Sequence, residues 1–513
     1  MGSRVLFVAA EALPLAKTGG LGDVVSALAV ALGARGVEVN LLLPAYPQAL
    51  DEARGLRQIG QFDQLAGGSG QLLHGCMPDS DLPVTLLRMD QLYGRAGNPY
   101  QDENGVEFSD NAVRFAALCQ AAALISDGQS RLEAPHIVHA HDWHAGLTPL
   151  YMRRFGPAAL PSLITIHNLA FQGNFPIEVA KAIDVDSEYL GSDGVEFWGQ
   201  LSFLKAGIRY ADRITTVSYS YAEEILTPEF GCGLEGLLSA RRDRLSAVPN
   251  GIDTLLWDPS RDPLIAAPFD ANDMKGKLTC KRALQQTFGL QIDPFAPILG
   301  LGSRLTTQKM GDVACEALDE LLRENTRLQI AVLGTGDADL ENRFRELANR
   351  YPARAGVIIG YDEKTAHGLH AGADMLLHGS RFEPFGLTPV YAMRYGTVPI
   401  ASRVGGLIDT IVDRGSAEEP ADHASGFLFD GDAVGAMVDV VRRALVAFET
   451  PRIWRALQQT GMRGDYGWDT SAERYVALYR SMTEDHPDGS FKVPLKEFAP
   501  AQKTQALTAK KRA

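Results

Sequence analysis

LFVAAEALPLAKTGGLGDVVSALAVAL, Leu6 to Leu32, is the stretch that decides the fold, because an apolar strand runs through a glycine-rich turn into a helix. Apolar residues recur at i, i+4 and i+8 from Val24, which predicts the helix. The turn Lys17-Thr18-Gly19-Gly20 can bring backbone N–H groups close to a ligand, since glycine has no Cβ to block the approach. The positive end of the helix macrodipole faces that turn. The segment therefore predicts a parallel α/β fold with a cradle for an anion.

The turn alone leaves two interpretations open. Its spacing matches neither G-x-G-x-x-G nor G-x-x-x-x-G-K-[ST], so it supports neither a dinucleotide fingerprint nor a P-loop. A glycine-rich connection that binds no ligand fits the turn as well as an anion site does.

Composition narrows the class of protein. The 513 residues, 45% of them hydrophobic, allow roughly two to four domains with ample core. The net charge of −14 argues against nucleic acid or an anionic membrane as the main partner, although a local basic pocket can hold a phosphate. Apolar runs are too short to span a membrane and the first residues lack the layout of a signal peptide, so we expect a cytoplasmic location. Five scattered cysteines without C-x-x-C spacing indicate reduced thiols.

The pattern of apolar runs divides the chain into two α/β halves. Strands are expected in the first half at Val5, Val37, Val84, Ile137 and Leu163, and in the second at Ile298–Gly302, Leu328–Leu333, Val357–Ile359, Asp374–Leu377 and Val398–Ala401. We expect doubly wound domains at 1–250 and 251–463, with a proline-rich linker near 248–268. A ligand is expected in a cleft between the carboxyl edges of the two sheets. Residues 485–513 are expected to form a solvated tail.

The second half carries the stronger chemical clusters. In GSRLTTQKMGD, Arg304 and Lys309 follow a predicted strand, where two cations could hold a diphosphate; two solvated surface cations are the simpler alternative. In HGSRFEPFGLTP, Glu383 follows a strand and Gly386-Leu387-Thr388 begins a helix. Glu383 then either points into the cleft or caps the helix. Gly405-Gly406-Leu407 offers another close backbone approach, a weak signal by itself.

Histidines gather in the first half. HIVHAHDWHAGL invites a metal assignment, but His139 and His141 share one face of a strand while His144 lies beyond its end, and no familiar ligand spacing is complete. We expect no metal there and interpret the cluster as polar lining of a sugar cleft. In THNLAFQGNF, His167 ends a strand before a polar, aromatic loop suited to sugar rings; a structural histidine is the alternative.

Taken together, these clusters resemble a known family. KTGGLGDV, HAHDWHAGL, THNLAFQG, EFWGQLSFLKAGIRYADRITTVS, PEFGCGLEGLL, PNGID, GSRLTTQK, IGYDE, SRFEPFGL and RVGGLIDT occur in the order found in bacterial glycogen synthases and plant starch synthases, over about Arg4 to Tyr479. The resemblance implies two facing Rossmann-like domains of the glycosyltransferase B type, an ADP-glucose donor and an α-1,4-glucan acceptor. It also implies that a last helix, at about 464–484, crosses back to the first domain.

The resemblance implies roles for individual residues. On the donor side, the N-terminal loop is expected to contact the donor through Lys17, Gly19, Gly20 and Asp23, with Asn250 as a further contact and Tyr361 near the adenine. The diphosphate is expected to meet the cations Arg304 and Lys309 and, beside them, a backbone cradle formed by Gly386, Leu387 and Thr388. The glucan side is expected to be lined by Asp142, Trp143 and Asn168, and the transferred glucose to be surrounded by His167 and Glu383.

These roles imply a retaining transfer. An α-linked donor and an α-linked product favour front-face attack by the acceptor hydroxyl, with the leaving phosphate taking its proton. Arg304 and Lys309 then stabilise the leaving group in place of a metal, so no cofactor is expected. The sequence departs from the family pattern at Phe385, Pro389 and Met310, which puts packing and the shape of the diphosphate loop in question.

Two alternatives remain, and the oligomeric state stays open. One is another retaining nucleotide-sugar transferase that uses UDP-glucose or a small acceptor. The other is a glucan-binding protein that has lost catalysis, although Lys17, Arg304, Lys309 and Glu383 are all present.

Overall fold

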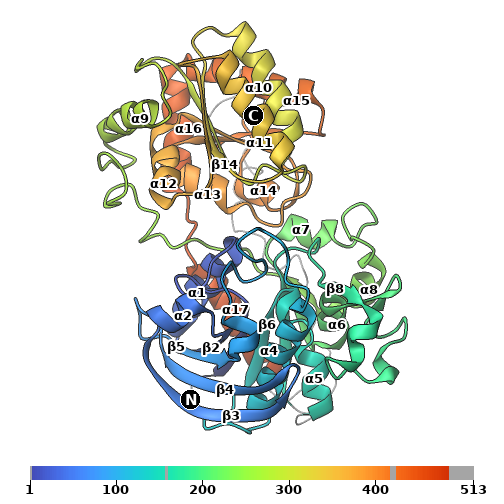
Figure 1. The fold of residues 1–513 in the computed structure, drawn as a ribbon. Helices are drawn as coiled ribbons and strands as arrows, with labels where there is room; N and C mark the ends of the chain where they lie inside the picture. The colour runs from blue at the N-terminus through green and yellow to red at the C-terminus, as the bar shows by residue number, and fades with distance from the viewer. Residues whose placement is uncertain (1–2, 156–159, 416–422, 484–513) are drawn as a thin grey trace, which may run out of the picture. The chain divides into compact units, whose positions relative to one another are not determined.

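The computed structural model describes residues 3–155, 160–415 and 423–483, and it divides into two compact units (Figure 1). The first unit holds the chain up to Thr18, Leu32–Val248 and the chain from Glu473 onward. The second holds Gly19–Ala31 and Pro249–Ala472. The tail expected at 485–513 lies outside the described residues.

A nine-stranded sheet forms the core of the first unit, in the order β12-β11-β7-β6-β1-β2-β5-β4-β3. Its strands are β1 (Arg4–Val8), β2 (Glu38–Pro44), β3 (Arg54–Leu65), β4 (Gly68–Cys76), β5 (Pro83–Arg88), β6 (Ile137–His141), β7 (Ser162–Ile166), β11 (Arg213–Thr216) and β12 (Leu245–Ala247). The strands from β12 to β5 pair in parallel, and β1 lies fully paired between β6 and β2 with Phe7 opposite both His139 and Leu41. Each strand predicted in this half is confirmed.

The antiparallel strands β3 and β4 were not predicted. They pair with each other, and β4 pairs with the edge of the parallel sheet through β5. Most side chains of β3 are exposed, and Phe62 and Leu65 are its buried apolar residues. A long strand at a solvated edge needs few apolar residues, so the alternation that marks a half-buried strand is absent.

Helices alternate with strands in the first half of the chain, which also holds three strands of a small antiparallel sheet. The helices are α1 (Gly20–Gly33), α2 (Pro47–Glu52), α3 (Asp90–Tyr93), α4 (Asn111–Ser126), η1 (Trp143–Ala145), α5 (Thr148–Phe155), η2 (Ile177–Lys181), η3 (Ser187–Tyr189), α6 (Phe203–Tyr210), α7 (Tyr219–Glu224), α8 (Glu235–Ala240) and η4 (Arg242–Arg244). The small sheet has the order β8 (Asn174–Pro176), β10 (Gln200–Ser202), β9 (Glu196–Phe197). Helix α4 is buried along nearly its whole length, as its AALCQAAALI segment predicts.

Six parallel strands form the sheet of the second unit, in the order β15-β14-β13-β16-β17-β18. They are β13 (Ile298–Gly302), β14 (Gln329–Gly334), β15 (Ala355–Ile359), β16 (Met375–His378), β17 (Val398–Ser402) and β18 (Phe427–Phe429). Five of the six were predicted, each within about two residues of the observed bounds. The strand order reverses between β13 and β16, which creates a topological switch point.

Helices alternate with these strands, as a doubly wound fold requires. They are α9 (Lys275–Thr287), α10 (Gly311–Glu324), α11 (Ala338–Arg350), α12 (Glu363–Gly372), α13 (Leu387–Arg394), α14 (Gly405–Thr410), α15 (Val434–Phe448) and α16 (Pro451–Arg463). The last helix, α17 (Asp469–Thr483), ends in the first unit, where Tyr475 and Tyr479 are buried.

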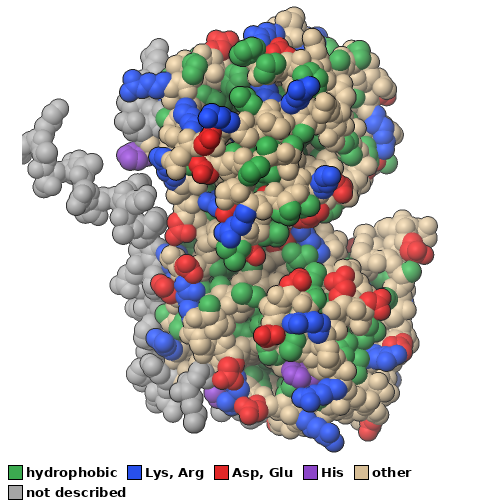
Figure 2. All heavy atoms as spheres, turned by 90° about the vertical axis from the view of Figure 1, so that its left-hand side faces the viewer, with side chains coloured by type: hydrophobic (Ala, Val, Ile, Leu, Met, Phe, Trp, Pro, Cys, Tyr) green, Lys and Arg blue, Asp and Glu red, His purple; other side chains and the backbone are tan. Residues whose placement is uncertain are grey.

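On the face drawn in Figure 2, cationic and anionic side chains are interspersed over both units, and no large area carries one sign. The net charge of −14 is therefore not gathered into one acidic surface on this face. Within the described ranges, every helix is too short or too polar to cross a membrane.

Candidate active-site residues

The sheet topology of the second unit places two predicted loops side by side. Strands β13 and β16 are parallel neighbours at the switch point, so their carboxyl ends lie at one edge of the sheet. Arg304 and Lys309 lie in the loop that follows β13, and Glu383 lies in the loop that follows β16. Residues 74 positions apart in the sequence therefore meet at this edge.

Glu383 is the centre of a buried charged cluster. The Nζ atom of Lys309 and the Nε2 atom of His378 both donate to its Oε2 atom, the latter at 2.8 Å. The side chains of Glu383 and Lys309 are only 9% and 12% exposed. Burial by itself raises the pKa of Glu383, but the charge of Lys309 and the hydrogen bond from His378 outweigh it and hold that pKa well below its usual range. Glu383 is therefore an ionised carboxylate at neutral pH.

His378 completes this cluster, and the sequence analysis assigned it no role. It is the last residue of β16, and burial together with the charge of Lys309 lowers its pKa, so the ring is neutral. Since an ionised carboxylate can only accept, Nε2 of His378 carries the proton. Its place at the carboxyl end of a central strand, five residues before Glu383, was the available signal.

Close packing explains why glycine occupies positions 386 and 406 beside Glu383. Gly386 precedes α13 with φ 88°, and a Cβ there would lie 2.6 Å from Leu407 Cδ2. A Cβ on Gly406 would lie 2.4 Å from Cα of Phe385, while the backbone N–H of Gly406 donates to the carbonyl of Glu383 at 3.0 Å. The Gly386 loop is thus pressed against α14, and this contact fixes the backbone that carries Glu383.

The loop after β13 has its own constraint. Met310 is fully buried and adopts the left-handed conformation, with φ 52°, directly before α10. Met310 is one of the three positions at which the chain departs from the family pattern, with Gly311 one place later. Arg304, on the exposed side of the same loop, donates from Nη2 to Gln308 at 3.2 Å. The loop keeps both cations while it carries a methionine in a conformation that usually favours glycine.

In the first unit, Asp142 organises the ends of β6 and β7. It has φ 57°, and its Oδ1 atom accepts from the backbone N–H groups of His167 at 2.7 Å and Asn168 at 3.3 Å. Burial raises the pKa of Asp142 to about 7, although these two N–H groups act in the opposite direction. Three of the predicted residues therefore meet at the carboxyl edge of this sheet.

The histidines form a packed, uncharged group. His141 and His167 face each other with Nδ1 and Nε2 at 3.0 Å, and His139 contacts the hydroxyls of Tyr479 at 2.8 Å and Thr165 at 2.6 Å. Burial lowers the pKa of each ring, to about 3 for His167. Among the described residues, no three His, Cys, Asp or Glu side chains are arranged to hold a metal ion.

Trp143 lies in an aromatic cluster. Its ring packs against Phe115, Phe175 and Phe203, and a Cβ on Gly173 would lie 2.3 Å from Cε3 of the indole. Trp143 therefore positions the loop that follows β7.

Glu11 anchors the N-terminal turn and was also missed. It is buried, and its Oε2 accepts from the backbone N–H of Thr18 at 2.5 Å while its Oε1 accepts from the hydroxyl of Tyr100. Lys17 is half-buried and Gly19 is exposed beside this anchor. A carboxylate in an otherwise apolar run after a first strand was the signal for it.

The remaining predicted residues are spread over the two units. Asp23 lies on α1, Asn250 lies three residues after the end of β12, and Leu387 and Thr388 are the first residues of α13. Tyr361 follows β15, is 64% exposed, and donates its hydroxyl to the carboxylate of Glu363.

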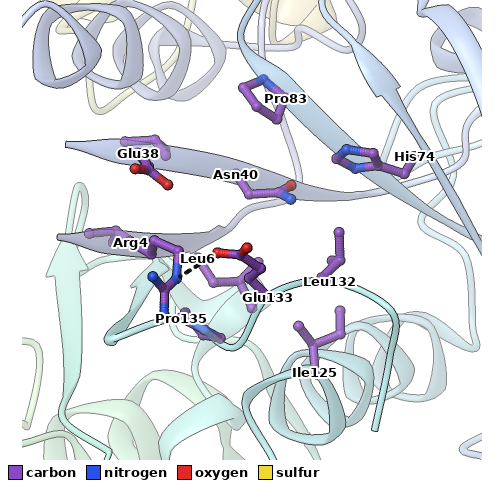
Figure 3. Close-up of a pocket in the computed structure, with 12 residues that line it drawn as sticks. Arg4, Leu6, Glu38, Asn40, His74, Pro83, Ile125, Leu132, Glu133 and Pro135 are labelled. Atoms are coloured by element: carbon purple, nitrogen blue, oxygen red, sulfur yellow. Dashed lines mark ion pairs between the residues drawn. The ribbon is translucent and has the colours of Figure 1, made fainter. Parts of the chain in front are cut away.

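A separate cavity of about 220 Å³ lies at the opposite edge of the first sheet (Figure 3). It is lined by Arg4 and Glu38, at the amino ends of β1 and β2, and by His74 and Glu133, which pairs with Arg4 at 3.6 Å. None of the predicted site residues lines it, and ligands of open α/β sheets bind at carboxyl edges, so we do not assign the reaction to this cavity.

Comparison with known proteins agrees with this arrangement. Residues 4–240 match the family described as the starch synthase catalytic domain, and residues 287–456 match glycosyl transferases group 1. The glycogen synthase of Bordetella bronchiseptica is 53% identical over 96% of this chain and 98% of its own length, and that of Ralstonia nicotianae is 52% identical over 94% and 88%.

A solved structure is also similar over almost the whole chain. The catalytic domain of starch synthase IV from Arabidopsis thaliana, bound to ADP and acarbose, aligns with a TM-score of 0.86 and 29% identity, covering 94% of this chain and all of that one. This similarity confirms the predicted fold class of two Rossmann-like α/β units. The match to the bacterial enzymes over nearly their whole length shows that the chain belongs to the glycogen synthase family of glycosyltransferases.

Proposed function

We propose that this protein transfers glucose from ADP-glucose to the non-reducing end of an α-1,4-glucan, with retention of the anomeric configuration. The observation that carries the proposal is the 53% identity to a glycogen synthase over 96% of the chain. The starch synthase neighbour, whose structure holds ADP and acarbose, supports an ADP-linked donor and a glucan acceptor.

The cluster around Glu383 supplies the charges that such a transfer needs. Sugar transfer through an oxocarbenium-like state places positive charge on the sugar and negative charge on the departing diphosphate. We assign the ionised Glu383 to the sugar side and Lys309 and Arg304 to the diphosphate. Lys309 has three N–H donors and gives one to Glu383, so two remain for phosphate oxygens.

Glu383 is held so that one oxygen can serve the substrate. Among the described residues, both recorded side-chain hydrogen bonds of this carboxylate end on Oε2. We therefore assign Oε1 as the acceptor for a glucose hydroxyl. His378 fixes the rotamer of the carboxylate through Oε2 and acts as a positioning residue.

The loop that follows β7 supplies a neutral polar group rather than a charge. The low pKa of His167 makes it a neutral ring that can exchange hydrogen bonds with the glucose, and Asp142 holds the backbone of His167 and Asn168 in place. On the strength of the family motifs, we assign Lys17, Gly19, Gly20 and Asp23 to the donor, Asn250 as a further donor contact, and Tyr361 to the nucleotide half of the donor.

Retention without a covalent intermediate follows from the same assignments. We propose that the acceptor 4-hydroxyl attacks from the face that the diphosphate leaves, and that the leaving phosphate oxygen takes its proton. Two fixed cations replace a divalent metal in this scheme, so the reaction needs no cofactor.

A radiolabelled donor panel with glycogen as acceptor tests the function. We expect ADP-glucose to label glycogen much faster than UDP-glucose does. Enzymes specific for α-1,4 linkages should then release the incorporated label as glucose and maltose. Equal or faster incorporation from UDP-glucose would overturn the donor assignment, and glucan binding without any incorporation would favour a protein that has lost catalysis.

A further inference from the structure

Trp198 is the most exposed of the large hydrophobic side chains that the structure describes, at 83%. It stands with Gly199 at the tip of the hairpin between β9 and β10. Single exposed apolar residues are common on protein surfaces, so exposure alone would carry no argument. The backbone at this position is the second observation.

Trp198 has φ 52° and Gly199 has φ 78°. Two consecutive positive φ angles are typical of the type I′ hairpin turn, in which Asn-Gly is the favoured pair. A bulky side chain in the left-handed region is sterically strained and is a genuine outlier. Stability would favour asparagine at this tip, so the indole is retained at a cost to folding.

The neighbouring loop leaves room for the ring. A Cβ on Gly233 would lie 3.2 Å from Nε1 of Trp198 and 3.0 Å from Cζ of Phe197, and Gly233 has φ 82°. The hairpin tip is itself fixed, because the backbone N–H of Gly199 donates to Oε1 of Glu196 at 2.7 Å. The Nε1 edge of the indole therefore approaches a surface without a side chain, and the rest of the ring is largely exposed.

The hairpin is attached to the loop that carries His167. That loop runs from the end of β7 to Gly173, where β8 begins, and β8 pairs with β10. The backbone N–H groups of Phe203 and Leu204 donate to the carbonyls of Gly173 at 3.1 Å and Gln172 at 3.0 Å. In Figure 1 β8 lies beside α6 and α8 in the green part of the first unit. Trp198 is thus joined through β10 and these hydrogen bonds to the loop assigned to the sugar.

We propose that Trp198 is a stacking platform for a glucose ring of the glucan chain, several residues from the end that is extended. The inference rests on the proposed function for the identity of the ligand. An exposed indole face matches the C–H face of a pyranose ring, and the exposed Gln200, two residues further along the hairpin, offers an amide to a ring hydroxyl. Such a contact gains affinity for long chains and leaves the donor site untouched.

Affinity electrophoresis in gels that contain glycogen tests the platform without requiring transfer. We expect Trp198→Ala to raise the dissociation constant for glycogen about fivefold or more, the effect of losing one aromatic contact, and Trp198→Phe to restore part of it. The matched control is Phe295→Ala, since Phe295 is 74% exposed in the second unit. Trp198→Gly, which relieves the strain of the positive φ, should bind glycogen as weakly as Trp198→Ala does. Its unfolding free energy should be at least that of the wild type.

Kinetics separate the platform from the reaction. With Trp198→Ala we expect a higher KM for glycogen, and unchanged values of kcat, of KM for ADP-glucose and of the rate with maltotriose. Unchanged retardation by glycogen would overturn the inference, as would a loss shared by Phe295→Ala, which would point to nonspecific adhesion. If the wild type binds glycogen through Trp198 but transfers from no nucleotide sugar, the proposed function fails and the platform stands.

Discussion

Replacing Lys309 with alanine removes the cation that we assign to the leaving group. A hydrogen-bond donor aimed at charge that develops in the transition state contributes about 3 kcal/mol, which corresponds to roughly a hundredfold in turnover. Lys309 is only 12% exposed, so solvent screens it little and water replaces it poorly. We therefore expect kcat for Lys309→Ala to fall by about a hundredfold or more.

The same substitution has a pH-dependent effect on stability. In the wild type the pKa of Glu383 lies below its unfolded value, so the pair stabilises the fold above about pH 4.3 and this contribution is lost as the pH falls. Without Lys309 only His378 opposes the effect of burial, so we expect the pKa of Glu383 to rise above the unfolded value and ionisation then to cost stability as the pH rises. The loss of unfolding free energy should approach about 3 kcal/mol at pH 8 and be smaller at pH 5.

Lys281→Ala is the matched control. Lys281 pairs with Asp374 at 2.7 Å in the same unit, with side chains 4% and 12% exposed, but Asp374 precedes β16 and so lies at the edge away from Glu383. Denaturant unfolding and radiolabelled transfer should show that Lys281→Ala loses stability and retains kcat within a few-fold. Equal losses of kcat in the two variants would refute the assignment of Lys309 to the leaving group.

Three further predictions concern the first unit and the cofactor. The unfolding free energy of Asp142→Asn relative to that of the wild type should increase by on the order of 2 kcal/mol from pH 5.5 to pH 8. Native Asp142 keeps its proton to about pH 7, while the unfolded chain loses it near pH 4. A difference in urea unfolding that does not change with pH would contradict the raised pKa. Tyr479→Phe should lose about 1–3 kcal/mol of unfolding free energy, because it leaves Nδ1 of His139 without the hydroxyl that lies 2.8 Å away. The hydroxyl of Tyr475 lies 3.5 Å from that of Thr165, so Tyr475→Phe should lose less in the same assay. Dialysis against EDTA should leave transfer from ADP-glucose intact, and loss of activity restored by one divalent ion would refute the metal-free mechanism.

The parallel strands could be predicted because they are buried on both faces, and such strands have continuous runs of apolar residues in the sequence. The runs at Val5 and Val37 became β1 and β2, and the turn between the first run and its helix lies where the sequence placed it. The hairpin of β3 and β4 could not be predicted in this way. Its strands are stabilised by pairing with β5 and with each other, and that pairing partner is invisible in a local pattern of side chains.

The site divides along the same line. Asp142, His167 and Glu383 could be proposed because each follows a strand that the sequence reveals. Several neighbouring residues that hold the site together could not. Glu11 contacts Thr18 through the turn, and Tyr479 reaches His139 across 340 residues of chain. Such contacts depend on strand order and helix docking, which motif spacing does not specify.

Glu383 shows why the order of strands matters for the chemistry. A carboxylate this buried would carry a raised pKa by itself, and a protonated acid could not stabilise positive charge on a sugar. Its ionisation depends on Lys309, which the topology delivers from the loop after β13 only because β13 and β16 are neighbours. Under the proposed function, the remaining donors of Lys309 hold the diphosphate while one keeps Glu383 ionised, so one lysine couples recognition of the leaving group to the charge that faces the sugar.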